Sequence, residues 1–101
     1  MAQFDIYRRG AAGVAFLVDL QEEMLDGLST RVVAPLVDVN EVAAPMKIVN
    51  PRIMVNGVSC ILMTHLLAAV PVSNLVGEPV GSAKGQRDEI VAALDLLFTG
   101  I

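Results

Sequence analysis

Few side chains in this sequence could do chemistry, and their spacing does not favour it. His65 is the only histidine and Cys60 the only cysteine. A spacing of five residues places two side chains on opposite faces of a strand, which is poor geometry for a nucleophile and its base. A small buried thiol and a core or edge histidine are therefore the simpler interpretation. A single cysteine also excludes an internal disulfide and favours a reducing compartment.

Acidic side chains gather at Glu22, Glu23 and Asp26, where they could bind a cation or act as acid and base. Adjacent acids just before a glycine are more often a solvated surface. A metal site needs three or four converging ligands, and scattered carboxylates with one histidine and one cysteine give no such pattern. The nearest sequence to a phosphate-binding loop, GSAKG at 81–85, lacks the required spacing. We therefore expect no catalytic residue, no cofactor and no metal site.

The composition indicates a single domain, residues 1–101, with more apolar surface than its interior can bury. Hydrophobic residues make up 54% of the 101 residues and charged residues 18%, which excludes intrinsic disorder. The apolar excess predicts an interface with a second subunit or another partner. A net charge of −4 disfavours direct binding to a nucleic-acid backbone.

We expect a cytoplasmic protein without membrane contact. The first ten residues contain Asp5, Arg8 and Arg9 and no apolar segment of the kind that a secretory signal needs. The most apolar stretch, 58–76, is interrupted by polar residues and a proline. Buried strands explain this stretch better than a membrane span does.

Hydrophobic alternation predicts a series of short strands. The segments are 3–8, 14–20, 31–37, 42–49, 52–55, 59–64, 70–72 and 75–76. A turn with two glycines over 9–13 joins the first two strands into a hairpin, and Asn56-Gly57 is typical of a second hairpin. Pro35 indicates an edge strand or a bulge, and 21–26 fits a loop or one helical turn.

The last third of the chain changes to a helical period. Its apolar residues recur every three or four positions: Ile90, Val91, Leu94, Leu97 and Phe98. This period predicts a helix over 84–98, with Ser82 as N-cap and Gly100 in the left-handed conformation that ends helices. Short strands followed by one terminal helix indicate a mainly β fold, a small antiparallel barrel capped by a helix.

Two apolar groups are candidates for contact surfaces. Met24-Leu25 lies beside acids in a predicted loop, where it covers a core edge or contacts a partner. The segment 95–101 ends on an apolar residue, and its carboxylate adds negative charge to a helix C-terminus. A positive group from another subunit or a partner should compensate that charge. The alternative is that Phe98 and Ile101 pack on the core of their own domain.

Several short segments occur in an order and spacing that are specific, although each is weak alone. They are Gln3-Phe4 with Tyr7, Phe16–Gln21, Arg31–Leu36, Met63-Thr64, Val70–Ser73, Gly77-Glu78 and Leu96–Ile101. Over its whole length the chain thereby resembles the CcdB family, the toxins of plasmid-type toxin–antitoxin pairs. The resemblance implies an SH3-like antiparallel β-barrel with a small strand wing and a C-terminal helix.

The resemblance also implies a function without catalysis. Toxins of this family are homodimers that insert into the dimer of the DNA gyrase A subunit and trap its cleaved DNA complex. A CcdA-like antitoxin neutralises them through a disordered tail, and the two together act as a transcriptional co-repressor, so contact with DNA is only indirect. The gyrase-binding positions that carry over are Met24, Leu25, Asp95, Phe98, Thr99, Gly100 and Ile101.

One position departs from the family pattern. The family's tail reads Phe-Trp-Gly-Ile, and Thr99 stands where that tryptophan stacks on a gyrase arginine. An aromatic hot spot is worth about 2–4 kcal/mol, so a homologue that keeps dimerisation and antitoxin binding but no longer poisons gyrase is an alternative. Asp95 also adds a negative charge where a neutral amide is common. A ribonuclease, an activity found on the same barrel, is disfavoured by the acidic charge and the single histidine.

Overall fold

The computed structural model describes residues 2–8, 14–75 and 77–100. The turn predicted over 9–13 therefore lies outside the described residues, as does Ile101. The strands are β1 Asp5–Arg8, β2 Phe16–Asp19, β3 Thr30–Asp38, β4 Arg52–Val55, β5 Val58–Leu62, β6 Ala68–Pro71 and β7 Gly81–Ser82. The helices are α1 Arg87–Thr99 and five single-turn 3₁₀ helices, η1 Glu23–Leu25, η2 Val39–Glu41, η3 Thr64–Leu66, η4 Val72–Asn74 and η5 Lys84–Gln86.

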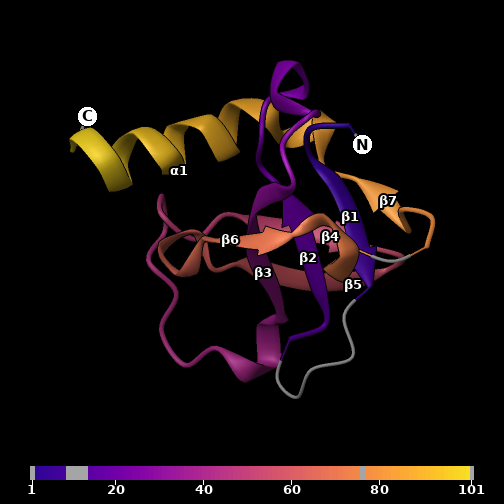
Figure 1. Cartoon of the computed structure of the whole chain (residues 1–101). Coiled ribbons are helices and arrows are strands. Elements are labelled where there is room, and N and C mark those ends of the chain that lie inside the picture. Colours follow the sequence, from indigo (N-terminus) through magenta and orange to yellow (C-terminus); the bar gives the residue numbers. More distant parts are fainter. Residues whose placement is uncertain (1, 9–13, 76, 101) are drawn as a thin grey trace.

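The strands form an antiparallel sheet in the order β4-β5-β3-β2-β1-β7. This sheet curves into a nearly closed barrel, and α1 lies across one end of it (Figure 1). Strand β6 stands outside that order and pairs with the first half of β3, in keeping with a small strand wing. The predicted fold class, an SH3-like antiparallel barrel with a C-terminal helix, is confirmed.

Strand β3 is the central strand, so of the two interpretations of Pro35, an edge strand or a bulge, the edge strand is wrong. On one side β3 pairs with β2, with Pro35 opposite Leu17. On its other side the partner changes along the strand, from β6 beside Thr30–Val33 to β5 beside Leu36–Asp38. Pro35 stands at the change of partner, where a missing backbone N–H removes least from the ladder.

The hairpin predicted at Asn56-Gly57 is confirmed. Both residues have positive φ, 50° and 83°, as a tight two-residue turn between β4 and β5 requires. The strand predicted over 42–49 is wrong, because this segment is irregular and ends in a turn. Asn50 closes that turn: its amide N–H donates to the Met46 carbonyl, and its side-chain oxygen accepts from the Met46 amide.

Two further predicted strands have different bounds in the structure, because 3₁₀ turns follow them earlier than expected. The strand predicted over 59–64 is β5, which starts one residue earlier and ends at Leu62, so that Thr64 begins η3. The strand predicted over 70–72 is the end of β6, which η4 interrupts at Val72. No strand includes Leu75, and Val76 lies outside the described residues.

The predicted helix is confirmed, but it begins later than expected. Residues 84–86 form η5, and α1 runs from Arg87 to Thr99 after Gln86, which caps it without a side-chain hydrogen bond. The N-cap prediction for Ser82 is therefore wrong; its hydroxyl accepts from the amide of Lys84 at 3.2 Å. Gly100 has φ 76° and its amide donates to the Leu96 carbonyl, so the predicted left-handed helix end is confirmed.

The core lies between the barrel and the first three turns of α1. Ile90 and Ala93 are fully buried, and Ile90 packs on the barrel interior, which includes Phe4, Ile6, Val18, Leu36 and Leu62. No residue of α1 after Ala93 is fully buried. In Figure 1 the last turns of the helix project beyond the strands. The fold thus anchors the first part of α1 and presents the remainder to its surroundings.

Candidate functional site

The C-terminal end of α1 presents an apolar aromatic side chain to solvent. Phe98 is 69% exposed, which removes the alternative that it packs on its own core. The other groups of this turn are satisfied locally: the Thr99 hydroxyl donates to the Asp95 carbonyl at 2.7 Å, and Gly100 closes the helix. An exposed phenylalanine at a rigid helix end is a ready contact for another protein.

A second apolar group lies on the loop between β2 and β3. Met24 is 89% exposed and Leu25 49%, and both belong to the 3₁₀ helix η1. The prediction of a loop or one helical turn over 21–26 is thereby confirmed, and Met24 covers no core edge. Hydrogen bonds from the Leu25 amide to the Glu22 carbonyl and from the Leu28 amide to the Leu25 carbonyl keep the loop compact.

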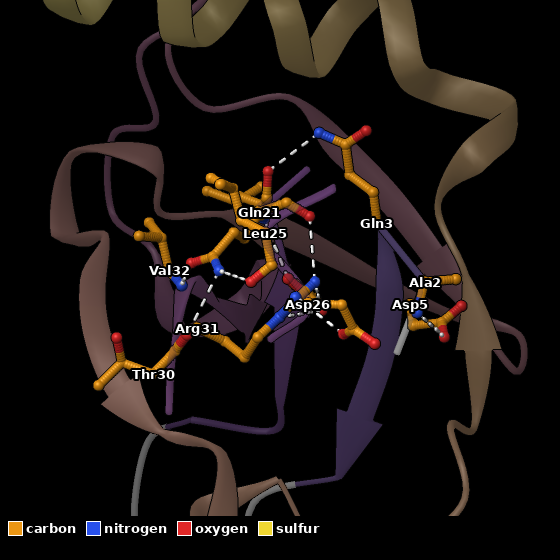
Figure 2. Close-up of polar contacts among 11 residues, drawn as sticks. Ala2, Gln3, Asp5, Gln21, Leu25, Asp26, Thr30, Arg31 and Val32 are labelled. Atoms are coloured by element: carbon orange, nitrogen blue, oxygen red, sulfur yellow. Dashed lines mark hydrogen bonds and ion pairs between the residues drawn. The ribbon is translucent and has the colours of Figure 1, made fainter. Parts of the chain in front are cut away.

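A buried ion pair of Arg31 with Asp19 supports this loop; Figure 2 shows Arg31 together with the loop residues Gln21, Leu25 and Asp26. The side chains of Arg31 and Asp19 are both completely buried, and Arg31 Nη2 lies 2.7 Å from Asp19 Oδ2. Arg31 also donates through Nη1 to Asp26 Oδ1 at 3.1 Å and through Nη2 to the Gln21 carbonyl at 3.1 Å. A buried guanidinium requires such partners, because it keeps its charge under all ordinary conditions.

The three acidic residues of this loop therefore differ in their surroundings. Glu22 and Glu23 are exposed, as predicted for a solvated surface. Asp26 was expected to be part of the same surface, but its half-exposed carboxylate is paired with Arg31. This network was not predicted from the sequence, because Arg31 looks like any other residue of a predicted strand. The one indication in the sequence was that Asp19 and Arg31 stand on either side of the same loop, each beside apolar strand residues.

One chain does not bring the two apolar groups together. Glu23 of η1 lines a shallow depression with Lys84 and Arg87, at the beginning of α1. Phe98 lies about 16 Å further along the helix axis, at 1.5 Å per residue. Figure 1 shows the η1 loop near the first turns of α1 and the C-terminus at the far end of the helix. Of the predicted site residues, Asp95, Phe98, Thr99 and Gly100 share one helix end, Met24 and Leu25 share the loop, and Ile101 lies outside the described residues.

A groove of about 550 Å³ runs along the C-terminal half of α1. It is largely apolar, and its lining comes from three segments: Val42, Ala44, Met46, Val49, Asn50, Met63, His65, Leu96 and Leu97. Asn50 is buried and donates through Nδ2 to the Leu62 carbonyl, with His65 Nδ1 at 3.3 Å. This groove is a further apolar surface on α1, lined by Leu96 and Leu97 of the helix. It could not be predicted from the sequence, because 42–49 was expected to be a strand.

Cys60 and His65 do not form a nucleophile–base pair. Cys60 is fully buried, and burial, reinforced by the charge of Asp38, raises the pKa of its thiol. His65 is exposed in η3, and its neighbour is Asn50 rather than the thiol. Among the residues that the structure describes, no three His, Cys, Asp or Glu side chains converge as metal ligands would. In the same residues no helix has the length and apolarity to cross a bilayer.

The features present define the class of a small, mainly β domain, a barrel with a C-terminal helix whose projecting end and whose β2–β3 loop expose apolar side chains. Residues 3–100 match the family model described as CcdB protein, so the chain belongs to the CcdB family. The resemblance seen in the sequence is thereby confirmed. Membership implies a toxin of a toxin–antitoxin pair that poisons DNA gyrase, and a poison rather than an enzyme.

Proposed function

We propose that this chain is a cytoplasmic toxin that binds the DNA gyrase A subunit as a homodimer and is neutralised by a CcdA-like antitoxin. The observation that carries the proposal is the exposed Phe98 at the projecting end of α1. An aromatic side chain held on a helix loses little conformational entropy on binding, and such anchors dominate protein interfaces. Family membership supports DNA gyrase as the partner.

The gyrase-binding surface that we propose consists of two parts. Asp95, Phe98, Thr99, Gly100 and Ile101 supply the helix end, and Met24 and Leu25 supply the loop. Asp95 is exposed and gives the surface a carboxylate for a basic group on the partner. Because each chain keeps the two parts at different ends of α1, a twofold pair presents two helix ends and two loops to a twofold partner.

Induced expression in a bacterium with susceptible gyrase tests this proposal. We expect growth to stop and covalent complexes of gyrase with cleaved DNA to accumulate, and co-expression of the antitoxin to restore growth. Expression in a strain whose gyrase A subunit resists other toxins of this family is the control. Healthy growth with verified soluble expression in the susceptible strain would contradict the proposal.

A second candidate function rests on Thr99. Its hydroxyl is already bonded to the Asp95 carbonyl of its own helix, and it has no aromatic face for a partner's cation. This supports a homologue that still dimerises and binds antitoxin but has lost gyrase poisoning. The substitution Thr99→Trp separates the two: toxicity that appears only in the variant favours the second candidate, and toxicity of the wild-type chain excludes it.

A further inference from the structure

The charge of Arg31 is balanced without the η1 loop. Asp19 lies on β2, is completely buried, and accepts from both Nε and Nη2 of Arg31 at 3.0 and 2.7 Å. One buried carboxylate with two charge-assisted bonds neutralises one buried guanidinium. The second carboxylate, Asp26, is therefore not needed to keep Arg31 in the barrel.

Asp26 differs from Asp19 because it belongs to the exposed loop. It follows η1 directly as its C-cap, next to Leu25, and its side chain is 51% exposed. The bond from Arg31 Nη1 to Asp26 Oδ1 thus joins the barrel interior to the residue that follows the exposed Met24-Leu25 pair. This bond fixes the loop to the barrel.

Gln21 holds the same loop from its other side. Its side chain is buried, with Nε2 donating to the carbonyls of Leu25 and Thr30 at 3.1 and 3.3 Å and Oε1 accepting from the Val32 amide at 3.0 Å. The side-chain amide of Gln21 therefore holds the loop at its middle and at both of its ends. Figure 2 shows these bonds converging between β2 and β3.

We propose that Asp26, Arg31 and Gln21 are positioning residues that hold the loop in the conformation in which Met24 and Leu25 bind the partner. This inference rests on the proposed function, because it takes Met24 and Leu25 as contacts. Its physical reason is preorganisation: a loop that is already ordered does not lose that freedom on binding. The free chain then presents a rigid apolar contact instead of a mobile one.

The test compares three variants of the full chain. Asp26→Ala removes the pair with Arg31 while Asp19 keeps the guanidinium neutralised. Glu22→Ala is the matched control, because it removes an acid from the same loop and Glu22 makes no side-chain cap bond. Asp26→Glu restores the carboxylate. For each, amide hydrogen exchange of Leu25 and Leu28, urea denaturation and the Kd for the purified gyrase A subunit are measured.

We expect Asp26→Ala to speed exchange of these two amides about fivefold and to weaken binding about fivefold, as befits a half-exposed ion pair. Glu22→Ala should leave the exchange rates and the affinity unchanged, and Asp26→Glu should recover most of the wild-type value of each. The urea denaturation midpoint should move little in all three variants. Weaker binding with unchanged exchange would mean that Asp26 contacts the partner directly, and would overturn the inference. Faster exchange with unchanged binding, or equal acceleration of all amides, would also overturn it.

The same experiment distinguishes this inference from the proposed function. If the wild-type chain does not bind the A subunit, the proposed function is contradicted. The exchange rates of Leu25 and Leu28 still decide whether Asp26 fixes the loop: unchanged rates in Asp26→Ala would overturn that part as well, and faster rates would support it.

Discussion

Replacing Phe98 by alanine should strongly weaken partner binding without weakening the fold. A phenylalanine side chain can bury about 150–250 Å², and 69% of Phe98 is exposed, so about 100–170 Å² is available to a partner. At about 25 cal/mol per Å² this area is worth about 2.5–4 kcal/mol. The expected loss of affinity is about 70- to 900-fold, and the change in unfolding free energy should stay within about 0.5 kcal/mol.

Calorimetric titration of the purified gyrase A subunit, together with thermal unfolding of the free variant, measures both quantities. Met54→Ala is the matched control, because Met54 is 60% exposed on β4, away from the proposed surface, and its removal should leave the affinity unchanged. The reasoning is refuted if Phe98→Ala binds as tightly as the wild-type chain. It is equally refuted if affinity is lost only together with a large drop in Tm, since Phe98 would then act through the fold.

Three further predictions concern the fold that carries this surface. Arg31→Leu leaves Asp19 buried without its partner and should lower the unfolding free energy by about 3–5 kcal/mol, measured by urea denaturation. Burial raises the pKa of the Cys60 thiol above its usual 9.0 and that of Tyr7 above 10.0, with smaller contributions from nearby carboxylates. The folded state therefore holds these protons more tightly than the unfolded state, so stability is intact below about pH 9 and should fall as the pH rises above about 10. Denaturation midpoints measured on both sides of this range, with Cys60→Ala for comparison, check this prediction. Gly57→Ala forces a Cβ into φ 83° and should cost about 1–2 kcal/mol by the same denaturation assay.

Features that depend on neighbouring residues could be predicted from the sequence. The Asn56-Gly57 turn, the period of α1 and the helix end at Gly100 each need only a few adjacent residues to specify them. Pro35 shows the limit of this approach. Its place within a central strand depends on β3 changing partner from β6 to β5, which is decided by segments about 23 to 36 residues away in the chain.

The sequence marked Met24 and Phe98 as candidate contacts, but not the side chains that support the loop. For both residues it left two alternatives open, packing on the domain's own core or contact with a partner; their exposure in the structure decides against core packing, and their role as contacts stays a prediction. The network of Asp19, Asp26 and Arg31 could not be predicted, because an ion pair across a loop depends on the register of two strands. Ser82 failed as N-cap for a related reason: β7 pairs with β1 at that residue and delays the helix.

Amide hydrogen exchange of the chain with and without the purified gyrase A subunit tests the central claim most directly. We expect slower amide exchange in two segments at once, residues 22–28 of the η1 loop and residues 95–100 at the end of α1, with no change in the hairpin of β4 and β5. Protection confined to other parts of the barrel, or no change at saturating concentrations of the A subunit, would contradict it.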